Sequence, residues 1–346
     1  MKKGILIAYG ELFLKSEGVR MLFQQKLVNN IKGFLPKAKL HVSRERIFIE
    51  KASKAKLKEI FGIAWIADAF YFENLKELLS FDFKKYIQKK ETFAIRMKHD
   101  RETIEKVAKL IDSKVELDKP KKELFIEKRG KAFFIYFKKI KGAGGLPVGS
   151  GGKVLAMVSG GIDSVPAAYL AAKRGAETIW VHFHSFPLVS NSSIEKTKEL
   201  AKVFEKYQKQ VKVHFIPFQD FQMKVKAKAP ENYRVLLYRR KMFQLAEKIA
   251  KKEGCDALVT GESLGQVSSQ TLANMRITGD GAKLPILRPL IGLDKEEIIE
   301  IAKKIGTFNI SIKPQEDCCT LFVPKHQTAK GDLVIVKKLE KDLKRA

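Results

Sequence analysis

Apolar and polar positions along the first 73 residues follow the periods of strands and helices. Apolar runs and alternating segments predict strands, while apolar residues spaced three or four apart predict helices. By these criteria we expect helices at 18–33 and 54–61, and strands at 4–9, 40–42, 46–50 and 65–72. Elements that alternate in this way over so short a stretch indicate one small α+β unit.

A second α+β unit is predicted from about residue 74, with a helix at 101–112 and strands at 92–97, 115–117, 123–128 and 132–137. Four aromatic residues of the last strand could stack on bases, although for most of them we favour a place in the strand core: Phe133, Phe134, Tyr136 and Phe137. Basic residues at turns and strand ends are better candidates for phosphate contacts: Lys121, Lys122, Lys128, Arg129, Lys131, Lys138, Lys139 and Lys141.

Residues 141–153 form the clearest linker, because six glycines and one proline leave little to bury. Beyond the linker, helical segments at 193–207 and 233–252 lie between apolar runs that predict strands at 154–158, 178–183, 211–217 and 257–260. Strands that alternate with helices predict an α/β fold with a doubly wound parallel sheet. Ligands of such sheets bind beyond the carboxyl ends of the strands.

The sequence KVLAMVSGGIDS, which ends at Ser164, joins the first of these strands to a helix through a glycine turn. This geometry points free backbone N–H groups at an anion, and Gly160 and Gly161 let a phosphate approach the main chain. Ser159 and Ser164 add hydroxyl donors. Asp163 would repel a phosphate unless a cation lay between them, so we expect it to hold Mg²⁺. A tight turn without a ligand is the alternative that this stretch leaves open.

The chain has 346 residues, enough for two or three domains, and a formal net charge of +28. Basic residues outnumber acidic residues by 34 to 18 in residues 1–146 and by 33 to 21 in residues 147–346. The excess is therefore densest in the half that lacks the SGGIDS segment. Nucleic acid is the partner that such a charge favours. Solubility, or a lysine-rich adaptation to growth temperature, is the alternative explanation.

Three cysteines cannot form a disulfide framework, and the two C-x₂-C pairs of a zinc site are missing. The apolar start at 5–8 is too short for a signal peptide. No apolar run approaches the roughly 18 residues that span a bilayer. We therefore expect a protein of the reducing cytoplasm that does not interact with membranes.

Other polar residues of the second half could serve a nucleotide. Arg239 or Arg240, on a predicted helix, could meet the charge on a leaving pyrophosphate. Lys295 begins another helix and could reach phosphates, although an exposed first-turn lysine is the usual case. His182 and His184 share a strand face and could bind a metal. We favour the alternative that they are simply polar residues at the end of a strand.

Cys318 and Cys319 follow Pro314 in a predicted loop. In so cationic a protein, a loop thiol could be held as a thiolate and act as a nucleophile or sulfur carrier. An idle cysteine is the alternative, and it is the interpretation that we favour for Cys255, which lies between a helix and a strand. For the adjacent pair we favour a chemical role, because two neighbouring loop thiols are unlike packing residues.

Six segments together resemble one enzyme family, the tRNA 4-thiouridine synthetases or tRNA sulfurtransferases. In order and spacing they are KVLAMVSGGIDS, VHFHSFP, YRRKMF, TGESLGQVSSQT, LPILRPLIGLDKEEII and SIKPQEDCCTLFVP. The first is similar to the SGGxDS loop of N-type ATP pyrophosphatases, and no G-x-x-x-x-G-K-[ST] occurs. The resemblance covers essentially the whole chain. It implies a ferredoxin-like domain at 1–73, a THUMP RNA-binding domain at 74–146 and a PP-loop ATP pyrophosphatase domain at 147–346.

The resemblance implies ATP-dependent transfer of sulfur to uridine 8 of tRNA, which gives 4-thiouridine. ATP would adenylate O4 of the uracil, and a persulfide sulfur would attack C4 with release of AMP. Asp163, Lys295 and Cys318 match residues that the family needs for activation and sulfur transfer. Positions that match ATP contacts are Met157, Val158, His182, Phe183, Arg239, Gly261 and Gln270, to which the glycine turn adds Ser159, Gly160, Gly161 and Ser164.

The same resemblance implies a homodimer that binds the acceptor-stem side of tRNA. The chain matches the form of the family without a C-terminal rhodanese domain, so a cysteine desulfurase or another persulfide donor would supply the sulfur. Two other interpretations are an amide-forming adenylating synthetase of the same fold and a tRNA-binding protein without catalysis. The basic first 146 residues argue against the former, and the intact SGGIDS and GES segments argue against the latter.

Overall fold

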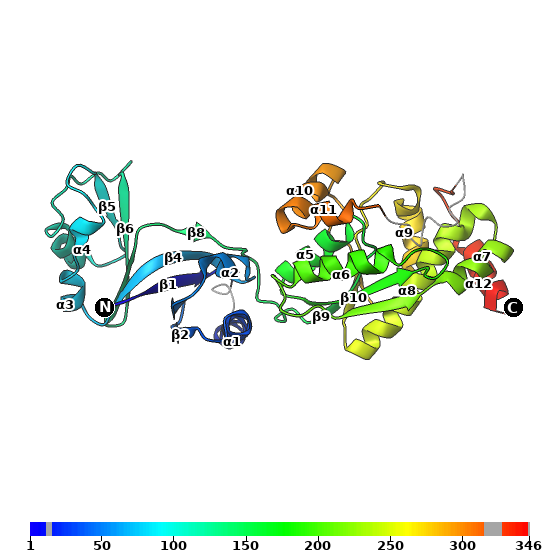
Figure 1. The fold of residues 1–346 in the computed structure, drawn as a ribbon, viewed down its shortest axis with the longest axis horizontal. Helices are drawn as coiled ribbons and strands as arrows, with labels where there is room; N and C mark the ends of the chain where they lie inside the picture. Colours follow the sequence, from blue (N-terminus) through cyan, green and yellow to red (C-terminus); the bar gives the residue numbers. More distant parts are fainter. Residues whose placement is uncertain (12–15, 315–326, 345–346) are drawn as a thin grey trace. The chain divides into compact units, whose positions relative to one another are not determined.

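The computed structural model describes residues 1–11, 16–314 and 327–344. The chain divides into two compact units, Met1–Pro147 and Val148–Ala346 (Figure 1), and the division falls within the glycine-rich segment 141–153. In the described ranges, no helix has both the length and the apolar character needed to cross a membrane.

The first unit is built on one eight-stranded sheet, with strand order β2-β3-β1-β4-β7-β6-β5 and with β8 paired to β4. Its strands are β1 (Lys2–Tyr9), β2 (Lys39–Val42), β3 (Arg46–Glu50), β4 (Ile63–Phe72), β5 (Phe93–Arg96), β6 (Lys122–Arg129), β7 (Ala132–Tyr136) and β8 (Ile140–Lys141). Its helices are α1 (Glu17–Phe34), α2 (Lys54–Glu59), α3 (Leu75–Leu79) and α4 (Arg101–Ala108), with a 3₁₀ turn at Phe83–Lys85. All neighbours are antiparallel except β5 and β6.

Strand β4 is shared by both halves of this sheet. One edge of β4 pairs with β1 from Ile63 to Tyr71. The other edge pairs with β7 through residues 69–72 and with β8 through Trp65 and Ile66. Alternate side chains of β4 point to opposite faces, as a strand requires. Ile66, Phe70 and Phe72 are buried in cores that the helices cover, whereas Trp65 packs in an aromatic cluster on the other face.

The strand predicted at 115–117 is wrong. Only Val115 forms an isolated bridge, to Phe93 of β5, and the chain leaves the sheet before Pro120. The N–H of Phe93 donates to the Lys114 carbonyl and the N–H of Glu116 donates to the Phe93 carbonyl, so the pairing involves a single residue of β5. Pro120, a few residues later, lacks the N–H that could extend it. The other strands and helices predicted in this unit are present, and their ends differ from the predicted ones by at most four residues.

The second unit contains the predicted parallel sheet, with strand order β11-β10-β9-β12-β13. Its strands are β9 (Lys153–Met157), β10 (Glu177–His184), β11 (Val213–Pro217), β12 (Ala257–Val259) and β13 (Ile286–Leu287). Its helices are α5 (Ser164–Lys173), α6 (Ser192–Phe204), α7 (Gln219–Lys228), α8 (Arg234–Glu253), α9 (Leu272–Gly279), α10 (Lys295–Ile305), α11 (Phe308–Ser311) and α12 (Leu333–Lys344), with 3₁₀ turns at Glu231–Tyr233 and Ser268–Gln270.

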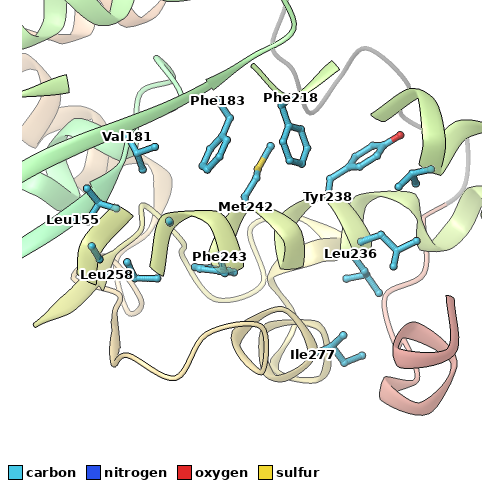
Figure 2. Packing of buried hydrophobic residues seen from close by; sticks show 14 of the residues in the cluster. Leu155, Val181, Phe183, Phe218, Leu236, Tyr238, Met242, Phe243, Leu258 and Ile277 are labelled. Atoms are coloured by element: carbon cyan, nitrogen blue, oxygen red, sulfur yellow. The ribbon is translucent and has the colours of Figure 1, made fainter. Parts of the chain in front are cut away.

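Helices cover both faces of this sheet, with α5 and α6 on one face and α8 on the other (Figure 1). Val181 and Phe183 of β10 pack toward Met242 and Phe243 of α8 (Figure 2). Burial of one such side chain stabilises the fold by about 1.5–3 kcal/mol. Trp180, which precedes Val181, points to the opposite face toward α6, where its ring centroid lies 5.1 Å from that of Phe204.

Strand β9 lies at the topological switch point of the sheet. The chain moves from β9 to β10 on one side and later returns to β12 on the other. The crossover helices therefore diverge beyond the carboxyl end of β9 and leave a crevice there. The SGGIDS segment follows β9 directly, so the fold places it in this crevice.

Candidate functional site

A cavity of about 220 Å³ opens at the carboxyl edge of the second unit's sheet, and we call it the edge cavity. The ends of β9, β10 and β12 and one side of α8 form its walls. Its lining residues are Met157, Val158, Ser159, Asp163, Ser164, Val181, Phe183, Arg239, Met242, Phe243, Thr260, Gly261, Glu262 and Gln270. Apolar side chains from β10 and α8 form one wall (Figure 2), and polar groups converge on the other.

The glycine turn is shaped by its own short contacts. Gly160 has φ of +83°, a left-handed conformation that costs other residues more than glycine. The backbone N–H of Gly161 donates to Ser159 Oγ at 3.3 Å, and Ser164 Oγ donates to the Gly161 carbonyl at 3.4 Å. Helix α5 then begins at Ser164, so its first N–H groups lie at the cavity and can bind an anion.

Gly261 lets β12 approach the start of α5. A Cβ atom at this position would lie 2.8 Å from the carbonyl carbon of Asp163 and 2.9 Å from the nitrogen of Ser164. Any larger residue would therefore push these segments apart. The end of β12 and the start of α5 are therefore packed against each other through this glycine.

Asp163 is held between two partners that lie far from it in the sequence. Lys295 Nζ donates to its Oδ1 at 2.6 Å, and Gln266 Nε2 donates to its Oδ2 at 2.9 Å. Because the Lys295 side chain is 44% exposed, this ion pair adds at most about 1 kcal/mol to stability. Lys295 is also the first residue of α10, where the helix macrodipole disfavours a cation. The main effect of the ion pair is therefore to position the Lys295 ammonium group at the cavity, and its contribution to stability is small.

The residues around Asp163 fit a Mg²⁺ ion that arrives with a polyphosphate. In the described ranges, no group of three or more His, Cys, Asp or Glu side chains is placed to hold a metal ion. Magnesium is commonly bound by one or two carboxylates together with substrate phosphates. Asp163 is the carboxylate that the glycine turn offers for such an ion.

Glu262, just beyond β12, is a buried carboxylate that binds two arginines. Its Oε1 accepts from Arg239 of α8, and its Oε2 accepts from Nε of Arg288 at 2.6 Å and from Thr260 Oγ1 at 3.0 Å. Arg239 NH1 also donates to Ser269 Oγ at 3.3 Å. Among the described residues, the buried Nε of Arg239 has no partner, so it retains a donor for a ligand. The group of Glu262, Arg239, Arg288 and Thr260 carries one net positive charge at the cavity.

Two predicted residues point away from the edge cavity. Arg240 follows Arg239 on α8 but is turned by about 100°, and it is buried in ion pairs with Asp280 and Glu340 at 2.8 and 2.9 Å. The prediction that Arg240 could meet the leaving pyrophosphate is therefore wrong. His182 lies on the α6 face of β10, where Nδ1 bonds to the Val158 carbonyl at 2.7 Å and Nε2 to Ser193 Oγ at 3.1 Å.

His184 is buried beside the same face of β10, and burial lowers the pKa of its imidazole. Cys255 is a buried free thiol whose pKa burial raises to about 11, which agrees with an unreactive packing residue. Cys318 and Cys319 lie outside the described residues.

Most predicted nucleotide-site residues meet at one place. Nine of them line the edge cavity: Met157, Val158, Ser159, Asp163, Ser164, Phe183, Arg239, Gly261 and Gln270. Lys295 reaches the cavity through Asp163, whereas Gly160 and Gly161 shape the turn without lining it. Sequence reasoning missed the roles of Gln266, Arg288 and Thr260. Their only signal was their place in two of the segments that carry the family resemblance, TGESLGQVSSQT and LPILRPLIGLDKEEII.

The first unit has a larger hollow, of about 740 Å³, which we call the basic hollow. Six cationic residues but only two carboxylates line it: Arg46, Arg96, Lys98, Lys128, Arg129 and Lys139, against Glu45 and Glu127. Three of these cations, Lys128, Arg129 and Lys139, are among the residues predicted to contact phosphates. Such a surface favours a polyanion.

Glu127 organises one side of the basic hollow. Its carboxylate binds Arg46 through Nε at 2.8 Å and NH2 at 2.9 Å, binds Arg129 at 3.1 Å and accepts from Tyr136 Oη at 2.9 Å. Burial raises the pKa of Glu127, but the contacts from Arg46, Tyr136 and Arg129 outweigh it and lower the pKa below the usual 4.5. Burial and the nearby Glu127 raise the pKa of Tyr136.

Aromatic rings underlie the cations of the basic hollow. Phe125 and Tyr136 are stacked with centroids 5.0 Å apart, and Trp65 lies 5.3 Å from Tyr136. Lys139 Nζ lies 4.3 Å from the Phe125 centroid, close enough for a cation–π contact. As predicted for the neighbouring strand core, Phe133, Phe134 and Tyr136 are buried, and Phe137 is half-buried.

Two family models match the chain. The model described as "Thiamine biosynthesis protein (ThiI)" matches residues 149–344, and that described as "ThiI ferredoxin-like domain" matches residues 4–67. Among curated relatives, a "Probable tRNA sulfurtransferase" of Caldanaerobacter subterraneus is 41% identical over 99% of this chain and 96% of its own length. A relative with the same description from Acetivibrio thermocellus is 38% identical, over 96% and 92% respectively.

Solved structures agree with these relatives. A 4-thiouridine synthetase–RNA complex with bound ATP matches with a TM-score of 0.89 and 32% identity, over 99% of this chain and 95% of that chain. PH1313 from Pyrococcus horikoshii matches with a TM-score of 0.66 and 22% identity, over 88% and 100%, which shows the fold alone. The predicted fold class, a ferredoxin-like α+β half followed by a PP-loop α/β sheet, is thereby confirmed.

Proposed function

Because the chain belongs to the tRNA sulfurtransferase (ThiI) family, we propose that it converts uridine 8 of tRNA to 4-thiouridine in a reaction that consumes ATP. The observation that carries this proposal is the edge cavity. There the glycine turn, the Asp163–Lys295 pair and the Arg239–Glu262 pair meet at the switch point of a parallel sheet. The ATP and RNA of the similar 4-thiouridine synthetase complex support the choice of substrates.

The proposed reaction has two chemical stages. O4 of the uracil attacks the α-phosphorus of ATP, and pyrophosphate leaves. The terminal sulfur of a persulfide on Cys318 then attacks C4, and AMP leaves with the former O4. A second thiol, from Cys319 or an external reductant, breaks the remaining sulfur–sulfur bond, which forms a disulfide and releases the thiolated base.

The chain's own residues bind and orient ATP for the first stage. The N–H groups at the start of α5 and the Ser159 and Ser164 hydroxyls would hold phosphates. Arg239, fixed by Glu262, and Lys295, fixed by Asp163, would meet the negative charge that grows on the leaving pyrophosphate. Asp163 would hold Mg²⁺ together with the phosphates, and the bound ion would neutralise part of the same charge.

We assign RNA binding to the first unit, with residues 74–146 as the THUMP domain and 1–73 as the ferredoxin-like domain. The basic hollow supports this assignment, because its cations can contact phosphates and its aromatic rings can support bases.

We also propose a cysteine desulfurase or another persulfide donor as partner, and assembly as a homodimer. Sedimentation equilibrium of the purified chain measures the latter.

Single-turnover conversion of unmodified tRNA tests the function. The protein is mixed with tRNA, ATP, Mg²⁺, a thiol reductant, cysteine and a cysteine desulfurase, and the nucleosides are analysed by mass. We expect one uridine to exchange oxygen for sulfur, with one AMP released. A Cys318→Ser variant should release AMP but form no thiouridine. AMP release that needs no tRNA would favour an amide-forming synthetase instead, and no AMP at all would refute the catalytic proposal.

A further inference from the structure

The loop after β10 exposes three consecutive apolar residues, Phe186, Pro187 and Leu188. Phe186 is 47% exposed and Leu188 is 51% exposed, although the flanking Ser185 and Val189 are buried. Within residues 1–11, 16–314 and 327–344, Phe186 is the most exposed aromatic residue, and no other three consecutive apolar residues other than glycine are all exposed. Such a run on a surface is unfavourable unless it has a function. We call Phe186–Leu188 the apolar tip.

The base of this loop is fixed, so the tip is held in one place. Ser185 Oγ donates to Gln222 Oε1 at 2.6 Å, and both side chains are buried. The backbone N–H of Val189 donates to the Ser185 carbonyl at 3.2 Å and closes the loop. The tip is thus presented by an ordered base, which lowers the entropic cost of binding a ligand to it.

The apolar tip also lies close to the edge cavity. It follows β10 at the carboxyl edge of the sheet, and Phe183, which lines the cavity, precedes Phe186 by only three residues. Three residues of extended chain span at most about 11 Å. A ring that rests on Phe186 is therefore within reach of a nucleotide bound in the cavity.

We propose that the apolar tip is the platform on which the acceptor uracil stacks once it has left the RNA helix, an inference that rests on the proposed function. An enzyme that modifies a base must take it out of the stack, and aromatic or apolar side chains commonly hold the extruded base. One exposed phenyl ring matches the face of one base. The tip alone is much too small for a protein interface, which typically buries about 800 Å² on each partner.

Kinetic comparison of Phe186→Ala with Phe186→Trp tests the platform. Both are measured for tRNA-dependent AMP release, for thiouridine formation and for ATP affinity by calorimetry. Loss of one stacked base predicts that Phe186→Ala lowers kcat/KM for tRNA in AMP release by roughly 5- to 150-fold. Phe186→Trp should retain most of the activity, because tryptophan keeps an aromatic face. Met223→Ala, at a 48% exposed position of α7, is the matched control and should behave as wild type.

The outcomes separate the inference from the function on which it rests. If wild type releases no AMP with tRNA, the proposed function fails and the platform fails with it. If wild type is active and Phe186→Ala equals it, the platform alone is refuted. Full AMP release with reduced thiouridine would instead assign the tip to the sulfur donor. Equal loss of ATP affinity would assign it to the nucleotide pocket, so either result overturns the proposal.

Discussion

Each unit of this protein contains a carboxylate that binds two arginines and one hydroxyl group. In the first unit, Glu127 binds Arg46, Arg129 and Tyr136. In the second unit, Glu262 binds Arg239, Arg288 and Thr260. Both groups keep one net positive charge after the carboxylate is counted, and both fix guanidinium groups that would otherwise be mobile.

The two groups differ in their surroundings. The Glu262 side chain is 2% exposed and lies in a cavity that apolar residues enclose on one side. The Glu127 side chain is 16% exposed and lies in the basic hollow, which several more cations line. A buried charge acts strongly on a small ligand beside it, whereas a charge that water reaches adds to a field that a long polyanion senses. The same arrangement thus suits a nucleotide in one unit and a nucleic-acid backbone in the other.

Asp163→Asn should give the largest separation between the two units. We expect AMP release to fall by roughly 10³-fold or more, because the variant loses both the charge that positions Lys295 and the carboxylate for Mg²⁺. Affinity for tRNA should be unchanged in a filter-binding assay, since the basic hollow is untouched. Asp220→Asn, on the exposed start of α7, is the control. An active Asp163→Asn enzyme would rule out the proposed role of this carboxylate.

The affinity for tRNA should fall steeply with salt. If about six phosphates are contacted, the loss is roughly 10³-fold between about 50 and 200 mM salt. The affinity for ATP, which would bind in the edge cavity of the second unit, should change far less over the same salt range. A flat response of tRNA binding would show that the charge of the first unit has another purpose.

Glu262→Gln should destabilise the second unit by about 3 kcal/mol, because two arginines lose the buried charge that compensates them. AMP release should also fall, while tRNA affinity stays the same. The chain has two tryptophans, Trp65 in the first unit and Trp180 in the second. In a Trp65→Phe background, urea unfolding followed by Trp180 fluorescence measures this effect. An unchanged midpoint would mean that the arginines find other partners.

Glu127→Gln should have a smaller effect, about 1–2 kcal/mol on the first unit, because water reaches this carboxylate. The pKa of Glu127 is lowered on folding, so its stabilising contribution is present at neutral pH and is lost as the pH falls below about 4.5. The difference between wild type and Glu127→Gln should therefore shrink in acid. In a Trp180→Phe background, Trp65 reports this unfolding, and a difference that grows in acid would contradict the assignment.

The parts of the second unit that could be predicted from the sequence are those that depend on residues close together in the chain. Strand β9, the glycine turn and α5 were predictable, because an apolar run, two glycines and a helical period follow one another without interruption. The meeting of the three carboxyl strand ends at one edge was also predictable from the parallel topology. The topology alone could not show that Phe183 lines the cavity and His182 does not. The difference arises because only the face of β10 toward α8 contributes to the cavity.

Other features depend on contacts between distant residues. Nothing in the local pattern shows that Lys295 meets Asp163, or that Arg288 shares a carboxylate with Arg239. Which of Arg239 and Arg240 faces the edge cavity is decided by the rotation of α8 against its neighbours, which is set by packing. The strand predicted at 115–117 is absent because only Val115 pairs with the sheet, through an isolated bridge to Phe93, and the local apolar pattern does not show where this pairing ends.

Strand β4 cannot complete its pairing until β7 has been synthesised. Its residues 69–72 pair with residues 133–136 of β7, about 60 positions later in the chain. At roughly 5–20 residues per second, a ribosome needs about 3–12 s to make the intervening segment. During that interval the edge of β4 has unpaired backbone groups beside Phe70 and Phe72, an arrangement that favours pairing with other nascent chains. Slow translation between residues 73 and 132 would therefore lower the yield of folded protein, even though no residue of the mature molecule had changed.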